Sequence, residues 1–173
     1  APDTGDNVGR LLRRISLIVG IEEFETRTGM DHHNLSKITS RVAPYDLSRG
    51  RALIHQLFPE DPVTRERLGN EYAKTWRAQT KLFFAQLNAP APMIDLHIAI
   101  RERGISHSRV YDILLANNIT KSLVHRFLHL QPVSWSVVEP LASTLFEQNH
   151  VTVLRTNWTT SVTPLLSKKT FAD

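Results

Sequence analysis

The chain has 173 residues, of which 41% are hydrophobic and 22% are charged. This balance is typical of a folded protein with one or two domains. There is no cysteine, which excludes disulfide frameworks, thiolate metal sites and cysteine nucleophiles. No apolar run approaches the roughly 20 residues that a membrane span needs, and the sequence does not open with the pattern of a signal peptide. We therefore expect a cytoplasmic protein that does not enter a membrane.

The net charge of +4 has the sign expected for a protein that binds nucleic acid. The positive charge gathers in two segments, residues 10–14 and 37–51, and the second of these contains a single acid, Asp46. Solvated helix faces are the alternative interpretation of both segments. Their basic residues are Arg10, Arg13, Arg14, Lys37, Arg41, Arg49 and Arg51.

Helical periodicity and proline-rich joints divide the chain into four segments. A first helical domain over residues 7–59 is followed by a linking helix over 62–88, a second helical domain over 93–148 and a tail over 149–173. The linking helix has Asp61 as its cap and Pro62 at its first position. The fold class we predict is all-α, with two helical bundles joined by a long helix.

Two further patterns concern the linking helix and the tail. The linking helix carries an apolar stripe that predicts packing against one of the bundles or, as the alternative, a dimer interface. In the tail, the β-branched runs 151–154 and 159–162 predict a strand or a small hairpin. The stripe consists of Leu68, Tyr72, Trp76, Phe83 and Leu87.

The first and second domains share a pattern of helix caps, apolar positions and a proline turn. Asp31 and Thr120, 89 positions apart, are each a good helix cap before two apolar residues at the same steps. Beyond Pro44 and Pro132, the correspondence continues at a spacing of 88 residues. We interpret the two segments as copies of one helical unit. The matched apolar pairs are Leu35 and Val124, Ile38 and Phe127, Leu53 and Leu141, Leu57 and Leu145, and Phe58 and Phe146.

Residues 21–38 have the pattern of two short helices around a tight turn. Gly29 suits the left-handed conformation that closes a helix, and Asp31 suits the N-cap of the next helix. The outer side of this second helix carries polar side chains long enough to reach base edges, with Arg41 beyond them for phosphate. The side chains are His32, His33, Ser36 and Lys37.

This segment resembles the lambda-repressor/Cro-like helix-turn-helix family over about residues 7–58. The resemblance implies a sequence-specific DNA-binding regulator from a bacterium, phage or mobile element. One position departs from the family pattern. Where the family has a small residue four positions before the turn glycine, this chain has Glu25, whose side chain must turn outward or widen the helix crossing.

The second copy places its first helix at 106–116, its turn at Asn117 and Asn118, and its recognition helix at 120–127. Another register takes Gly104 as the turn and exposes His107, Ser108 and Arg109 instead. Pro140 requires the last helix of this copy either to start at Glu139 or to kink. The candidate DNA contacts of the preferred register are Lys121, Ser122, His125 and Arg126.

The function we predict is a non-catalytic, nucleoid-associated regulator of transcription that binds double-stranded DNA without a cofactor. Lys37 and Arg126 are the candidates for guanine contacts, and the arginines at 13, 14, 41, 49 and 51 for the DNA backbone. We expect a homodimer that reads DNA with its first domain, joined through the tail or through the central helix, where Trp76 and Phe83 offer an apolar seam. The alternative is a monomer whose two copies act as a pair.

Two other functions compete with DNA binding. An interaction adaptor would use the stripe of Tyr72, Trp76 and Phe83. A metal-dependent enzyme would use His125 and His129, which have the spacing of a ligand pair on a helix. Since no phosphate loop, acid pair or nucleophile motif is present, we expect no enzyme activity and no bound metal.

Overall fold

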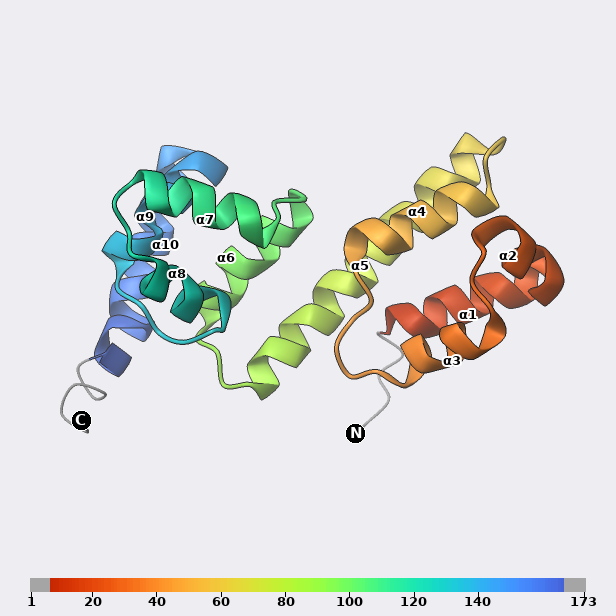
Figure 1. The fold of residues 1–173 in the computed structure, drawn as a ribbon, viewed down its shortest axis with the longest axis horizontal. Coiled ribbons are helices and arrows are strands. Elements are labelled where there is room, and N and C mark those ends of the chain that lie inside the picture. Colours follow the sequence, from red (N-terminus) through yellow and green to blue (C-terminus); the bar gives the residue numbers. More distant parts are fainter. Residues whose placement is uncertain (1–6, 167–173) are drawn as a thin grey trace. The chain divides into compact units, whose positions relative to one another are not determined.

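The computed structural model describes residues 7–166, and over that range every regular element is a helix (Figure 1). The predicted all-α class is therefore confirmed. The chain divides into two compact units, unit 1 (residues 1–83) and unit 2 (residues 84–173). The helices are α1 (Val8–Val19), α2 (Ile21–Thr28), α3 (His32–Ser40), α4 (Leu47–Leu57), α5 (Pro62–Gln86), α6 (Ala91–Glu102), α7 (His107–Ala116), α8 (Lys121–Leu128), α9 (Trp135–Leu145) and α10 (Gln148–Ser161).

In unit 1, helix α1 packs against α2, α3 and α4, and α5 closes the bundle. Tyr72 of α5 is fully buried, and its hydroxyl donates to the main-chain oxygens of Tyr45 and Asp46 at 3.1 and 3.3 Å. Its ring lies against Gly50, where a Cβ atom would come within 1.9 Å of the ring. Burial also raises the pKa of the Tyr72 hydroxyl, so this residue stays a neutral hydrogen-bond donor.

Helix α5 is therefore a structural part of unit 1 rather than only a link. Gln79 accepts a hydrogen bond from the backbone N–H of Val8 and donates to the carbonyl of Val42, which ties α5 to the start of α1. Trp76 is buried as well. The interpretation of the stripe as packing is confirmed for Tyr72 and Trp76, and the prediction of a dimer seam through Trp76 is wrong because that side chain is already covered. The helix also ends at Gln86, which leaves Leu87 exposed.

Two features predicted to recur between the domains, the helix cap and the turn before it, occupy the predicted positions. Asp31 and Thr120 each accept a hydrogen bond from the backbone N–H three residues on, as N-caps do. Two residues earlier in each case the backbone is left-handed, with φ of 71° at Gly29 and 64° at Asn118. Asn118 tolerates this conformation better than most residues with a side chain.

Helix α9 begins at Trp135 and contains Pro140. Of the two predicted options, the start at Glu139 is wrong, because the helix begins four residues earlier and continues through Pro140. Val137, Val138 and Leu141 are buried, so packing of this face holds the helix together across the missing amide of the proline.

The predicted strand or hairpin in the tail is wrong, because residues 148–161 form α10. The spacing of buried Val151, Leu154 and Trp158 places them on one helical face, which packs against α6 and α9. Threonine hydroxyls on the outer face donate to the carbonyls four residues earlier, so the β-branched residues are accommodated. Tertiary packing thus overrides local β propensity. Residues 167–173 of the predicted tail lie outside the described residues.

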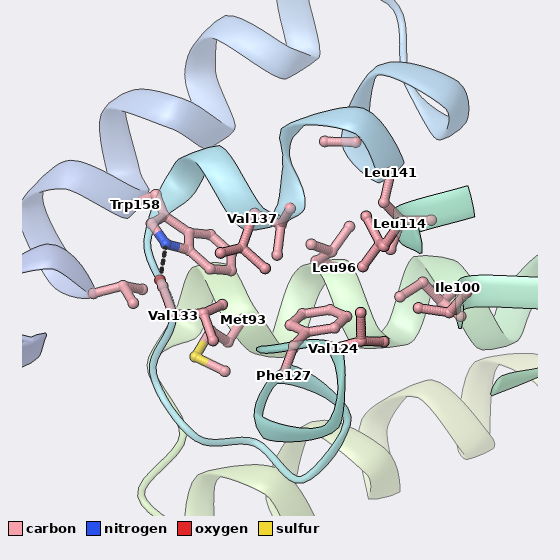
Figure 2. Packing of buried hydrophobic residues seen from close by; sticks show 14 of the residues in the cluster. Met93, Leu96, Ile100, Leu114, Val124, Phe127, Val133, Val137, Leu141 and Trp158 are labelled. Atoms are coloured by element: carbon pink, nitrogen blue, oxygen red, sulfur yellow. Dashed lines mark hydrogen bonds between the residues drawn. The ribbon is translucent and has the colours of Figure 1, made fainter. Parts of the chain in front are cut away.

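Unit 2 has a core to which all five of its helices contribute (Figure 2). The indole N–H of Trp158 donates to the carbonyl of Val133 at 2.9 Å, which joins α10 to the segment before α9. On α6, His97 is buried; its Nε2 bonds the carbonyl of Phe127 at 2.9 Å and its ring stacks on that aromatic side chain. Burial lowers the pKa of His97 to about 4.

The low pKa of His97 predicts that unit 2 loses stability in mild acid. The unfolded chain binds a proton near the ordinary pKa of 6.5, whereas the folded unit stays neutral at this residue down to about 4. The contribution of neutral His97 to the free energy of unfolding is therefore fully present above pH 6.5 and is lost as the pH falls toward 4. We expect the free energy of unfolding to fall by about 2 kcal/mol between pH 7.5 and 5 because of this group.

Urea unfolding followed by tryptophan fluorescence at several pH values measures this effect. His97→Gln keeps a side-chain donor for the Phe127 carbonyl but does not titrate, so its stability should fall less over the same pH range. Equal pH profiles for the parent and the variant would contradict the assignment.

Candidate nucleic-acid interface

Helices α2 and α3 form the two arms of the predicted helix-turn-helix. Phe24 on α2, and Leu35 and Ile38 on α3, are buried, while the residues between them on α3 face away from the core. All four predicted base-reading side chains are exposed along one helix of nine residues. They are His32, His33, Ser36 and Lys37.

Glu25, the departure from the family pattern, caps α3. Its Oε1 accepts a hydrogen bond from the backbone N–H of His32 at 3.0 Å, and Asp31 accepts one from Asn34 at 2.7 Å. The side chain thus turns outward, as one of the two predicted options required. Two carboxylates consequently lie at the N-terminal end of α3, where the helix dipole favours negative charge.

The backbones of α1 and α3 touch at Gly9. A Cβ atom at this position would lie 2.7 Å from the Cα of Thr39 and 2.8 Å from the carbonyl oxygen of Ile38. The hydroxyl of Thr39 also faces the Gly9 carbonyl at 3.3 Å. Since no other residue fits here without a shift of the backbone, Gly9 fixes the distance between α1 and the C-terminal end of α3.

Next to this contact is an open hollow of about 520 Å³, which we call the arginine hollow. Neither α1 nor α3 contains a carboxylate within its own length. Arg14 lies 3.7 Å from Glu71 of α5 in an exposed ion pair, which is weak in water. The hollow therefore combines concave shape with positive charge. It is lined by Arg10, Arg13, Arg14, Leu17 and Thr39.

The sequence pattern identifies Arg13 and Arg14 as candidate backbone contacts, but it does not predict that they lie close to Thr39. The three arginines recur at the i, i+3 and i+4 spacing of one helical face, and this spacing is a signal that a sequence does carry. The proximity of Thr39 depends on the Gly9 contact and carries no local signal. The other predicted backbone contacts, Arg41 at the end of α3 and Arg49 and Arg51 on α4, are exposed but do not line the hollow.

In unit 2, Lys121, Ser122 and His125 are exposed at the predicted recognition helix, α8. Arg126 is different from its counterpart Lys37. It is half-buried, and its Nη2 donates to the carbonyl of Pro132 at 3.3 Å. One donor of the guanidinium is thus engaged inside unit 2.

The alternative register of unit 2 shares several features with the preferred one. Gly104 is left-handed at φ 67°, and Ser106 caps α7, so two capped turns follow each other. The residues that this register exposes, His107, Ser108 and Arg109, lie at the surface. Partial burial, with Arg101 and His129 nearby, lowers the pKa of His107.

The histidine pair proposed for metal binding lies at the end of α8. The rings of His125 and His129 are 4.0 Å apart, and Nδ1 of His129 lies 2.8 Å from the carbonyl of His125. Within residues 7–166, no group of three or more histidine and acidic side chains is arranged to hold a metal ion.

Comparisons with family models, curated proteins and solved structures found no match for this chain. The resemblance to the helix-turn-helix family therefore depends on the chain's own residues and their geometry. Among the described residues, no helix is long and apolar enough to cross a lipid bilayer.

The cap of α3 can be tested separately from any binding. Asp31→Ala removes the acceptor for the Asn34 N–H, and we expect a loss of about 1 kcal/mol in the free energy of unfolding. Asp31→Asn keeps an acceptor oxygen and should stay closer to the parent in urea unfolding. A loss in Asp31→Asn as large as that in Asp31→Ala would show that charge, rather than the hydrogen bond, provides the stabilisation.

Proposed function

We propose that this chain is a sequence-specific, DNA-binding regulator of transcription that reads the major groove with α3. The observation that carries the proposal is the exposed polar face of α3, held by a capped turn beside the arginine hollow. The major groove is wide enough for one helix, and a lysine suits the O6 and N7 acceptors of guanine. Lys37 takes this role, with His32, His33 and Ser36 as secondary readers.

Backbone contacts complete the interface. Arg13, Arg14, Arg41, Arg49 and Arg51 are exposed on unit 1. Arginines of this kind orient a protein on the duplex without reading its sequence. A protein with this function acts on chromosomal or phage DNA in the cytoplasm and needs no cofactor.

A position-by-position comparison of the units favours unit 1 as the DNA reader. The buried residues Val8, Leu12 and Ile15 of α1 correspond to Met93, His97 and Ile100 of α6, 85 positions later. On this alignment and that of the later helices, unit 2 has acidic or apolar residues where unit 1 has arginines. The pairs are Arg10 and Asp95, Arg13 and Ile98, Arg14 and Ala99, Arg41 and Leu130, Arg49 and Val137, and Arg51 and Glu139.

The alternative function as an interaction adaptor loses two of the three residues of its proposed surface, while Phe83 is half-buried. Tyr72 packs on Gly50 within unit 1, and Trp76 is 1% exposed. Neither side chain is available to a protein partner, so no observation favours the adaptor over DNA binding.

The corresponding basic positions of the two recognition helices should behave differently in DNA binding. We expect Lys37→Ala to weaken binding to the preferred duplex by about 1–3 kcal/mol and to relax base preference at one position. Arg126→Ala should leave DNA affinity close to that of the parent because the guanidinium is engaged with Pro132. Fluorescence anisotropy with a selected duplex and its single-base variants measures both effects.

Since Lys37 is exposed, its replacement should leave the melting temperature almost unchanged. If Lys37→Ala bound like the parent while Arg126→Ala bound more weakly, unit 2 rather than unit 1 would be the reader.

We also propose a homodimer, because one small helix-turn-helix unit buries too little DNA surface for high specificity. With Trp76 covered, the exposed aliphatic side chains closest together in sequence outside the arginine hollow are Ile18 and Ile21, and we place the dimer contact there. Light scattering at micromolar concentration should give a mass near twice 19.7 kDa. A mass near 19.7 kDa, both free and on a short duplex, would contradict the dimer.

A further inference from the structure

The two ends of α3 differ sharply in charge. At its N-terminal end, the carboxylates of Glu25 and Asp31 bond the backbone N–H groups of His32 and Asn34. The N-terminus of a helix is otherwise a favourable place for a phosphate, because its N–H groups and dipole attract anions. Here two of those N–H groups have carboxylate partners, and the negative charge of these partners repels a second anion.

The C-terminal end of α3 lies beside positively charged side chains, which favour the binding of a phosphate. Thr39, in the last turn, lines the arginine hollow together with Arg10, Arg13 and Arg14 of α1. From His32 to Thr39 the helix rises about 10 Å, so the acidic end and the basic hollow are well separated along it. A guanidinium matches the geometry of phosphate oxygens. The hydroxyl of Thr39 donates to the carbonyls of Leu35 and Gly9 at 3.0 and 3.3 Å, so the arginines supply the donors for a phosphate.

We propose that the arginine hollow binds a backbone phosphate of the duplex, and that Glu25 and Asp31 exclude phosphate from the N-terminal end of α3. The inference rests on the proposed function and specifies how α3 is oriented in the groove. The DNA backbone crosses the protein at the junction of α1 with the C-terminal end of α3. The N-terminal end of α3, with His32 and His33, then points toward base edges rather than toward the sugar-phosphate chain.

The experiment measures the affinity of the full chain for a selected duplex at several chloride concentrations. The test variant is Arg13→Ala with Arg14→Ala, and the control is Arg67→Ala with Lys74→Ala, which removes the same charge from exposed positions on α5. In the test variant we expect affinity at low salt to fall at least tenfold. The slope of log affinity against log salt, which is negative, should also become shallower by about 1 for each phosphate that the variant no longer neutralises.

The preference among single-base variants of the duplex should remain unchanged in the test variant. The control should keep the slope of the parent. If the test variant and the control changed affinity and slope equally, net charge alone would explain the result and the phosphate site would be disproved.

A second variant tests the acidic end. Glu25→Gln keeps an oxygen acceptor for the His32 N–H but removes the charge. We expect binding to all duplexes to become several-fold tighter at low salt, with the gain disappearing at high salt. Unchanged affinity at low salt would disprove the exclusion of phosphate by Glu25.

Two outcomes separate this inference from the function on which it rests. If the parent shows no salt-dependent duplex binding, the proposed function fails and this inference fails with it; if the parent binds but the test variant matches it, only the inference fails. Inorganic phosphate is compared with chloride at equal ionic strength as a competitor. Stronger displacement of the duplex by phosphate than by chloride, lost in the test variant, would support the hollow as the site of a backbone phosphate.

Discussion

The close approach of α1 to α3 at Gly9 is the constraint on which the candidate interface depends. A side chain at this position would overlap the backbone of α3. The two helices can therefore approach this closely only because the residue is glycine. The contact places Thr39 beside the arginines of α1. Packing of the kind that usually serves only stability therefore determines where charge and hydroxyl groups meet on the surface.

Units 1 and 2 share a left-handed turn and a capped start at α3 and α8 but complete their cores differently. Unit 1 buries the hydroxyl of Tyr72 against main-chain oxygens and is tied to α5 by Gln79. Unit 2 buries the imidazole of His97 and the indole of Trp158, each with a carbonyl partner. Buried polar groups with matched partners specify one arrangement of helices, since any other arrangement leaves them without hydrogen bonds.

Local signals account for what the sequence could predict. The caps at Asp31 and Thr120 and the turn at Gly29 are encoded within a few residues, and each was found in place. The partner of Glu25 and the hollow beside Gly9 depend on neighbours that only the folded unit supplies. The helix at 148–161 was missed because its valines and threonines favour strands locally, while the burial of Trp158 determines the outcome.

The contribution of α10 to the core of unit 2 determines the order in which the two units can fold during synthesis. Every buried side chain of unit 1 has been translated once the ribosome has passed Thr80, whereas the core of unit 2 lacks Trp158 and Val162 until much later. Unit 1 can thus fold on the nascent chain. The faces of α6 and α9 that α10 covers stay exposed in the meantime, and during this interval they are accessible to chaperones and to association with other nascent chains.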